Sequence, residues 1–418
     1  MPDVRQADFL TEIQMKLFYF NPEHDLALAN NHPNFVAPAS ARKMAADLRL
    51  LPLWWAEAGD SVLTDEMTAV AGGFWPERLQ EQLERVRLLT VREAVAEPGI
   101  RSIVPWGWNR MTASRMKQWG FAPELIPDDS YLTEWRRLSG RETAVVVLQE
   151  LRKAFAGDRS QTGRVLCGES RYCRTEHEIE TELSRYPNTI LKAPWSGSGK
   201  GLRLGKGCYG PPLSGWCKRV LHDQGGVVVE PYYDKVADFA FEYLSDGAGT
   251  LAYAGLSVFR TTQQGAYAGN WLAPEVEKWH GLAQYVSLAE LQAVEEQLRQ
   301  ILSHVVAHKY TGPLGVDLMV CRDSDRQFRI HPCVEVNLRM TMGFAAVRIG
   351  KWLSEGSTGR FVLDYSADAR MLAEDHRKRM QELPVVADAA GKIRSGYLPL
   401  TAVTEGVCYR AALLVEEK

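Results

Sequence analysis

The stretch GVDLMVCRDSDRQFRIHPCVEVNLRMTMG, from Gly315 to Gly343, is the most informative part of this chain of 418 residues. In its first half, apolar residues alternate with the carboxylate Asp317, and in its second half Glu335, Asn337 and Arg339 occupy every second position. Because successive side chains of a strand point to opposite faces, this spacing predicts a β-hairpin with one apolar and one polar face. The expected apolar face consists of Leu314, Val316, Leu318, Val320, Val334 and Val336.

The polar face of this hairpin has the chemistry of a metal site. Mg²⁺ takes a few carboxylate or amide oxygens and completes its shell with water and substrate phosphates. Asp317, Glu335 and Asn337 supply such oxygens, and Arg339 adds a positive charge beside them. A sheet with one solvated face explains the same alternation, and the hairpin by itself does not separate the two interpretations.

A glycine-rich segment supplies a second feature. TILKAPWSGSGKGLRLG, from Thr189 to Gly205, reads as a short apolar strand followed by a loop. Glycine lets backbone N–H groups close on a phosphate, and lysine adds positive charge. The segment has neither the Walker A nor the dinucleotide-binding spacing, and a flexible hairpin connection is the alternative. The candidate phosphate-binding residues are Lys192, Ser196, Gly197, Ser198, Gly199 and Lys200.

A third segment, GGVVVEPYYDKVADFAFEYL from Gly225 to Leu244, contains two expected strands. The first should stop at Glu230 because the proline that follows it cannot donate to a sheet ladder. The second is expected to start at Asp238. Glu230 and Asp238 would then flank a short link that could hold a nucleotide base and ribose. Two solvated carboxylates beside a turn explain the pattern equally well.

The order of these motifs, a strand with lysine and a glycine loop, then VVVEP, GVD and EVNLR, resembles the ATP-grasp superfamily. Each motif is short and common, but their shared order is specific. The resemblance implies a fold of the α/β and α+β classes. It would consist of an N-terminal Rossmann-like domain of the pre-ATP-grasp type, followed by two α+β subdomains that clamp ATP.

The resemblance also implies how the nucleotide would be held. Lys192 would contact the α- and β-phosphates, and the loop 196–201 would fold over the phosphates as a lid. Glu230 would bind the adenine amine, and Asp238 would bind the ribose hydroxyls. Arg141 in LSGRETA is a candidate for a further basic position near the start of the first subdomain, although a solvated arginine at a helix start is the alternative.

By the same resemblance, Asp317, Glu335 and Asn337 would hold one or two Mg²⁺ ions that bridge the phosphates. Arg339 would neutralise the charge of the transferred phosphoryl group. The sequence departs from the family pattern in two places. The polar insert CRDSDRQ lengthens the hairpin turn, and Leu338 stands where many relatives have proline. The insert makes Asp317 a less certain ligand than the other two.

Four segments are expected along the chain. Residues 15–135 should form the N-terminal α/β domain, 136–228 the first ATP-grasp subdomain with its glycine-rich lid, and 229–345 the second subdomain with the metal site. Residues 346–418 should add a charged helix near 367–382 and a final apolar strand, YRAALLV, packed on the core. Met1 to Gln14 are expected to be an unpaired leader.

Two further segments carry polar residues that could bind substrate. In NPEHDLALAN, four polar side chains (Asn21, Glu23, His24 and Asp25) follow the end of the expected strand KLFYF, where open α/β sheets place ligands. In the segment from Ser257 to Trp271, Arg260 and Asn270 could orient an acidic substrate. A hydrogen-bonded structural histidine and solvated loop residues are the respective alternatives.

Composition fits a globular enzyme, with 45% hydrophobic and 24% charged residues. A net charge of -3 gives no electrostatic footprint for nucleic acid. The seven cysteines are scattered and odd in number, which indicates reduced thiols and a cytoplasmic location. No apolar run approaches the roughly 20 residues of a membrane span. The oligomeric state is not indicated.

The sequence therefore predicts an ATP- and Mg²⁺-dependent ligase that activates a carboxylate as an acyl phosphate for attack by an amine or a similar nucleophile. Its partners would be small-molecule carboxylate and amine substrates of unknown identity. Two alternatives stay open. A kinase of the same fold would transfer the phosphoryl group to a stable product, and a nucleotide-responsive binding protein would hold ATP without chemistry.

Overall fold

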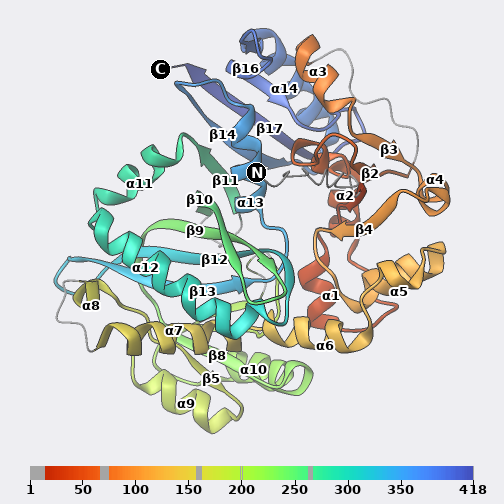
Figure 1. Cartoon of the computed structure of the whole chain (residues 1–418). Helices are drawn as coiled ribbons and strands as arrows, with labels where there is room; N and C mark the ends of the chain where they lie inside the picture. Colours follow the sequence, from red (N-terminus) through yellow and green to blue (C-terminus); the bar gives the residue numbers. More distant parts are fainter. Residues whose placement is uncertain are drawn as a thin grey trace, which may run out of the picture.

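The structure is a computed structural model that describes residues 15–65, 75–156, 162–197, 199, 201–261 and 267–417. The chain forms three β-sheets, each with helices packed against it (Figure 1). The fold-class prediction is confirmed, since a parallel α/β sheet near the N-terminus is followed by two antiparallel sheets in α+β surroundings.

The first sheet is parallel and has the strand order β3-β2-β1-β4. Its core includes Leu17 and Ile103, which are almost fully buried on the neighbouring strands β1 and β4. The strands are β1 (Met15–Tyr19), β2 (Ser61–Leu63), β3 (Arg87–Leu89) and β4 (Ile100–Pro105). The helices around them are α1 (His24–Asn30), α2 (Ala39–Asp47), η1 (Leu51–Trp54), α3 (Glu77–Leu83), α4 (Val91–Ala96), α5 (Arg110–Trp119), η2 (Pro123–Leu125) and α6 (Asp129–Leu138).

The smallest unit is an antiparallel sheet with the order β5-β8-β6-β7. Helices α9 and α10 cover it, and their apolar sides meet the sheet at Ile179, Leu191 and Trp216. The strands are β5 (Arg171–Cys173), β6 (Thr189–Lys192), β7 (Leu202–Gly205) and β8 (Val227–Pro231). The helices are α8 (Thr162–Val165), which precedes the sheet, α9 (Glu176–Ser184) and α10 (Pro211–Gln224).

The largest sheet has nine strands in the order β13-β12-β9-β10-β11-β14-β17-β16-β15. Its first half is β9 (Asp234–Asp246), β10 (Leu251–Thr261), β11 (Tyr267–Leu272), β12 (Thr311–Arg322) and β13 (Phe328–Asn337). The helices around this half are α7 (Arg141–Ala156), α11 (Glu275–Ala283), α12 (Leu288–Leu302), η3 (Ser303–Ala307) and α13 (Met342–Ile349). Phe239, Val316 and Leu298 belong to the core between the sheet and the helices.

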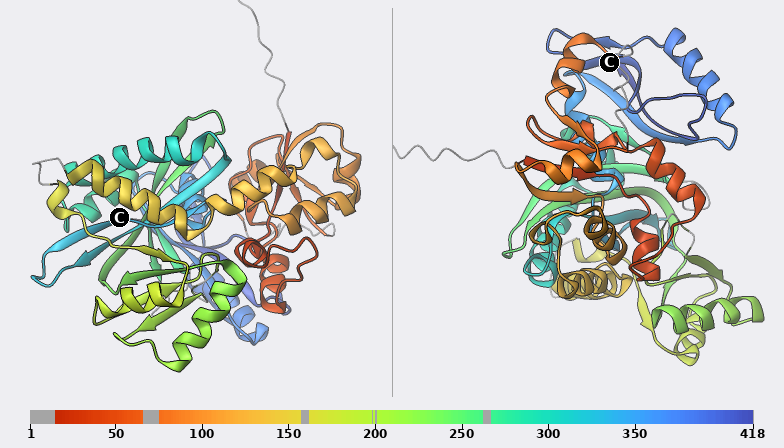
Figure 2. Two further views of the ribbon diagram at one scale, coloured as in Figure 1. Left: turned by 90° about the horizontal axis from the view of Figure 1, so that it is seen from below. Right: turned by 90° about the vertical axis from the view of Figure 1, so that its right-hand side faces the viewer.

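The C-terminal part completes this sheet at the opposite end of the molecule from α9 and α10 (Figures 1 and 2). It contributes η4 (Gly350–Trp352), β14 (Ser357–Tyr365), α14 (Ala369–Glu382), β15 (Val386–Ala387), β16 (Ile393–Pro399) and β17 (Tyr409–Glu417). The sequence predicted only the helix and the last strand here. β14, β15 and β16 were missed because they have no obvious alternating pattern of their own. β14 pairs with β11 and β17, and β16 pairs with β15 and β17.

Two strand boundaries were predicted wrongly. The first strand does not stop at Glu230, because Pro231 still pairs with Thr189 and ends β8. The strand after Pro231 starts at Asp234, not at Asp238, so Asp238 lies inside β9 and pairs with Met319. Helix α12 begins with a capping box between Ser287 and Glu290. Within the described ranges, no helix combines the length and apolar character that a membrane crossing requires.

Candidate active site

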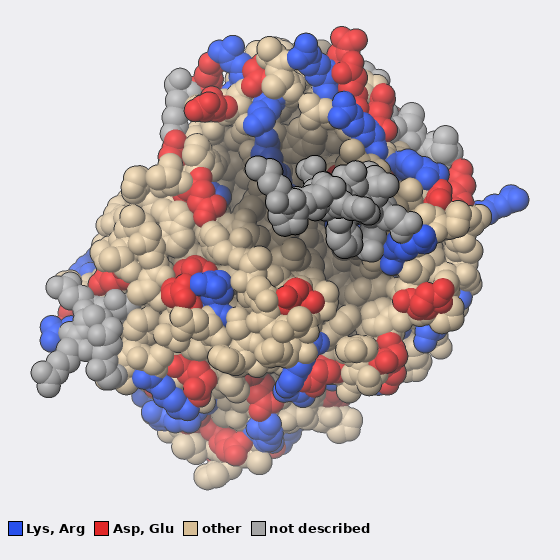
Figure 3. All heavy atoms as spheres, viewed as in Figure 1, with Lys and Arg blue, Asp and Glu red and all other residues tan. Residues whose placement is uncertain are grey.

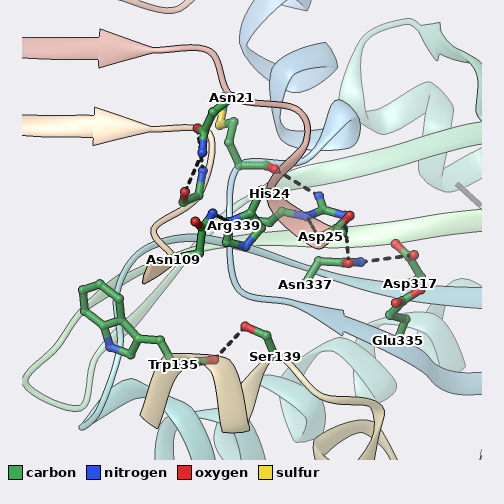
Figure 4. A network of polar contacts seen from close by, with 12 residues as sticks. Asn21, His24, Asp25, Asn109, Trp135, Ser139, Asp317, Glu335, Asn337 and Arg339 are labelled. Atoms are coloured by element: carbon green, nitrogen blue, oxygen red, sulfur yellow. Dashed lines mark hydrogen bonds and ion pairs between the residues drawn. The ribbon is translucent and has the colours of Figure 1, made fainter. Parts of the chain in front are cut away.

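The β12–β13 hairpin forms as predicted, and its polar residues share one face. Asp317 pairs with Glu335 and Gly315 pairs with Asn337, so the two carboxylates and the amide share one face. The side-chain N–H of Asn337 lies 3.3 Å from Asp317 Oδ2 (Figure 4). Val316, on the other face, is fully buried under α12 and its neighbours. The alternation therefore separates a core face from a polar face, as the sequence predicted.

The charge balance on this polar face favours a cation. Burial, together with the negative charge of Glu335, raises the pKa of Asp317 to about 7. Two carboxylates and one amide fit Mg²⁺, which needs only a few protein oxygens when phosphates and water complete its shell. Among the described residues, no cluster of three His, Cys, Asp or Glu side chains forms an all-protein metal cage. These residues therefore fit a metal ion whose remaining ligands are phosphate and water oxygens.

Lys192 and Glu230 are adjacent and nearly fully buried. Lys192 Nζ lies 2.6 Å from Glu230 Oε2, and the Ser170 hydroxyl donates to the other carboxylate oxygen at 3.0 Å. The two residues come from neighbouring strands, β6 and β8. The resemblance implied that Lys192 binds the phosphates and that Glu230 binds the adenine amine. In the structure they neutralise each other.

Arg141 connects the glycine-rich loop to the metal face. Its guanidinium donates to Ser196 Oγ at 2.8 Å and to the carbonyl of Ala193 at 2.5 Å, and it lies 2.8 Å from Glu335 Oε1. Arg141 is only 7% exposed, so the alternative of a solvated helix-start arginine is excluded. The chain enters α7 at this residue, which fixes the guanidinium between the two motifs.

The glycine-rich loop is held tightly where it is described. Gly201 accepts a hydrogen bond at its carbonyl from the Ala193 N–H at 2.9 Å, and a Cβ at Gly201 would lie 2.3 Å from Ser196 Oγ. Gly199 has φ +72°, a backbone conformation that favours glycine. Ser198 and Lys200, two of the predicted phosphate-binding residues, lie outside the described residues.

Two predicted residues have other surroundings. Asp238 is not at the end of a link facing Glu230; its carboxylate is 2.6 Å from Lys235 Nζ and accepts from the Thr261 hydroxyl at 3.0 Å. Ser257 on β10 pairs with Ala240, and Ala240 pairs with Asp317, so these three residues share the face of the candidate site. Arg260 lies three positions after Ser257, and strand alternation puts it on the opposite face. The structure therefore does not bring Arg260 to the candidate site.

Asn270, predicted as the companion of Arg260, lies on the same sheet face as Ser257. Its side-chain amide is buried, donates to the Ser257 hydroxyl at 2.6 Å and accepts from the Tyr267 hydroxyl. These bonds satisfy the Asn270 side-chain amide inside the protein.

Arg339 meets the N-terminal domain. Its Nε and Nη2 atoms each lie 2.8 Å from an Asp25 carboxylate oxygen, and Nη2 also contacts Asn337 Oδ1 at 3.2 Å (Figure 4). The Arg339 charge keeps the pKa of Asp25 below its usual range although burial raises it. The pair lies in a cleft that is also lined by His24, Ser139, Trp195, Ser196 and Glu335.

His24, beside this pair, is buried and neutral. Burial lowers its pKa to about 4, and the Asn109 side-chain amide lies 3.0 Å from His24 Nδ1. A Cβ at Gly107 would come within 2.5 Å of the imidazole, so the close approach requires glycine there. The sequence indicated His24 after a strand end, and the structure shows that Asn109, which follows β4, meets it there.

Glu242 is a site residue that the sequence did not indicate. It lies on β9, pairs with Gly315 and is 1% exposed. The Thr341 hydroxyl donates to Glu242 Oε2 at 2.9 Å, and burial raises the pKa of the carboxyl to about 8. The only signal was a lone glutamate within the apolar strand FAFEYL.

No protein-family model and no curated protein sequence matches the chain. Solved structures resemble it along nearly its whole length. N5-carboxyaminoimidazole synthetase from Staphylococcus aureus, complexed with ADP, is 11% identical, with 97% of this chain and 93% of that chain covered and a TM-score of 0.47. L-amino acid ligase from Bacillus licheniformis is 12% identical, with 97% and 94% covered and a TM-score of 0.43.

A biotin carboxylase complex with β-γ-ATP from Campylobacter jejuni is also similar. It is 11% identical, 97% of this chain and 87% of that chain are covered, and the TM-score is 0.49. These values describe a distant likeness in the arrangement of the chain. The function proposed below rests on the residues of the site itself.

Proposed function

We propose that this protein is an ATP-grasp enzyme that uses ATP and Mg²⁺ to activate a carboxylate as an acyl phosphate, which an amine or similar nucleophile then attacks. The observation that carries this proposal is the position of Arg141. One guanidinium contacts both Ser196 of the glycine-rich loop and Glu335 of the acidic sheet face. The candidate phosphate-binding loop and the candidate metal-binding face thus lie within the span of one side chain, which supports phosphoryl transfer as the reaction.

Each group of the site has a use in that reaction. The ammonium of Lys192 and the guanidinium of Arg141 would bind phosphate oxygens, leaving their present carboxylate partners free to contact the base and the metal. Asp317, Glu335 and Asn337 would hold Mg²⁺, which neutralises phosphate charge and polarises the transferred group. Arg339 would bind the incoming carboxylate close to the phosphoryl group, because a guanidinium matches a carboxylate in two parallel hydrogen bonds.

The charged residues of the site form opposite-charge pairs with one another. Lys192 with Glu230, Arg141 with Glu335 and Arg339 with Asp25 each lie within 2.8 Å. Such pairs lower the cost of keeping charges in a partly dry cleft before ligands bind. Nucleotide, metal and substrate would exchange these contacts for their own.

A kinase with the same site remains the second candidate, because phosphoryl transfer to any acceptor needs the same phosphate and metal contacts. The Asp25–Arg339 pair favours the ligase. The Arg339 guanidinium binds the Asp25 carboxylate in a bidentate contact, so a substrate carboxylate could bind Arg339 in the same geometry.

The proposal is tested by following ADP and phosphate release from Mg²⁺ and ATP with single carboxylates, single amines and pairs of them. Release that requires a carboxylate and produces free phosphate together with a condensed product supports the ligase. A stable phosphorylated product indicates the kinase. Tight ATP binding without release under all these conditions indicates a binding protein.

A further inference from the structure

The ion pair between Asp25 and Arg339 carries information about the substrate. It joins the N-terminal domain to the loop after β13, and both partners line the same cleft. The contact is bidentate, with both hydrogen bonds at 2.8 Å, and the side chains are 27% and 17% exposed. Both side chains are therefore accessible to a ligand, but each is buried enough that leaving its charge unpaired would be unfavourable in free energy.

From this pair we infer that the cleft binds a small zwitterion, namely an α-amino acid, whose carboxylate replaces Asp25 on Arg339 and whose ammonium group binds Asp25. The inference extends the proposed function by naming the substrate class of the same cleft.

Charge conservation in the cleft decides between substrate classes. A plain carboxylate that displaces Asp25 from Arg339 leaves the Asp25 carboxylate without a cation. A plain amine that binds Asp25 leaves the Arg339 guanidinium without an anion. A molecule with both groups leaves neither unpaired, and this matters because an unpaired charge in a partly dry site is unfavourable.

The other groups around Asp25 do not replace its partner. His24 is neutral because burial lowers its pKa to about 4. Arg141 is held by Glu335, Ser196 and the Ala193 carbonyl. Gly197 lies against Asp25, since a Cβ there would be 3.3 Å from Asp25 Cβ, and glycine adds no charge. An ammonium group on the ligand is thus the natural counter-charge for Asp25 once Arg339 is occupied.

An aromatic side chain helps to form the wall of the cleft. The Trp195 side chain forms part of the wall, and its indole N–H donates to the Arg136 carbonyl at 2.8 Å, which fixes the ring in place. Arg136 also covers this ring, with its guanidinium 3.7 Å from the ring centroid.

The inference is tested by direct binding, which does not require turnover. The full chain, with Mg²⁺ and a non-hydrolysable ATP analogue, is titrated with each proteinogenic α-amino acid, the matched des-amino carboxylic acid and the matched decarboxylated amine. At least one amino acid should raise the unfolding temperature and bind roughly ten- to a hundredfold more tightly than either analogue, the range expected for one charged hydrogen-bonded contact.

Two variants assign the preference to Asp25. Asp25→Asn should lose the preference for the amino acid over its des-amino analogue, and it should bind the des-amino acid more tightly than the wild type does, because the competing carboxylate is gone. The control is Asp129→Asn, which removes another bidentate aspartate–arginine pair, with Arg110, on the exposed surface of the same domain. This control should keep the wild-type preference.

Failure of this inference is distinguishable from failure of the proposed function. Equal binding of amino acid and des-amino acid by the wild type, or binding of no amino acid at all, overturns the inference. If ATP and a plain carboxylate still give ADP and phosphate, the ligase proposal stands without it. If the protein binds an amino acid but never binds the nucleotide, the inference is supported and the ligase proposal is contradicted.

Discussion

The guanidinium of Arg141 lies 2.8 Å from Glu335, so the first turn of α7 is joined to the acidic face of β13. The same guanidinium reaches Ser196 in the glycine-rich loop. Charged side chains from distant parts of the chain thus neutralise one another where ATP and metal are expected. Acidic and basic side chains are also interspersed over the face of the molecule in Figure 3.

The first prediction concerns Glu335 as a metal ligand. Glu335→Gln keeps the size of the side chain and can still accept from Arg141, so the fold should be retained, but the charge that holds Mg²⁺ is lost. Turnover of ATP should fall far more than tenfold, measured as ADP release at saturating Mg²⁺. The control is Glu416→Gln, an exposed strand carboxylate. Folded Glu335→Gln with turnover within about tenfold of wild type, about 1.4 kcal/mol in barrier, would contradict the assignment.

The second prediction separates the two roles of Lys192. Lys192→Met should weaken ATP binding by about 1.5 to 3 kcal/mol, the scale of a hydrogen bond to a charged group. It should also destabilise the fold, because Glu230 is left buried and unpaired.

Adding Glu230→Gln to Lys192→Met removes the unpaired charge. The double variant should therefore recover stability in chemical denaturation but not its ATP affinity in calorimetric titration. Unchanged ATP affinity in Lys192→Met would mean that this lysine only neutralises Glu230.

The third prediction concerns the glycine-rich loop. Gly201→Ala should weaken ATP binding by roughly tenfold or more, about 1.4 kcal/mol, because its Cβ would collide with Ser196, which Arg141 holds in place. Gly210→Ala is the matched control, since nothing lies within 4 Å of a Cβ there. Equal ATP affinity of the two variants in titration would show that the loop conformation does not matter for the nucleotide.

The fourth prediction uses the raised pKa of Glu242. The folded chain keeps a proton on this carboxyl up to about pH 8, whereas the ordinary value is 4.5. The folded state therefore binds more protons between these values. The contribution of this group to stability is complete below about pH 4.5 and is lost as the pH rises through about 8, by at most about 1.4 kcal/mol per pH unit.

Glu242→Gln mimics the protonated carboxyl and removes this titration. Its free energy of unfolding, measured by denaturant at a series of pH values, should decline less than that of the wild type between about pH 5 and 8. Glu416→Gln should follow the wild type. Parallel curves for the wild type and Glu242→Gln would mean that the carboxyl is ionised in the folded chain.

Sequence reasoning found the features that depend on local pattern. Alternation of apolar and polar residues is a local property, so the faces of the Asp317–Glu335 hairpin could be predicted from spacing. The strand with Lys192 followed by glycines was likewise visible. The start of β9 was missed because Asp234, a residue disfavoured in strands, begins it by pairing with Arg322 on a neighbouring strand.

Contacts between distant segments could not be predicted. Asp25 and Arg339 are separated by 314 positions, and nothing in either motif indicates the other. Glu242 appeared as one polar residue in an apolar strand, and its burial depends on Thr341 and on the glycines of neighbouring elements. The error over Arg260 has a similar origin: its loop looked rich in donors, but the register of β10 decides which face it occupies.

The most direct test of the central claim follows the oxygen atoms of the carboxylate. An amino acid or carboxylate that supports ADP release is labelled with heavy oxygen in its carboxyl group, and the released phosphate is examined by mass spectrometry. If an acyl phosphate forms and a nucleophile displaces the phosphate, one labelled oxygen moves from the carboxylate to the phosphate. We predict that label in phosphate released by the wild type; unlabelled phosphate, formed together with ADP and product, would contradict carboxylate activation.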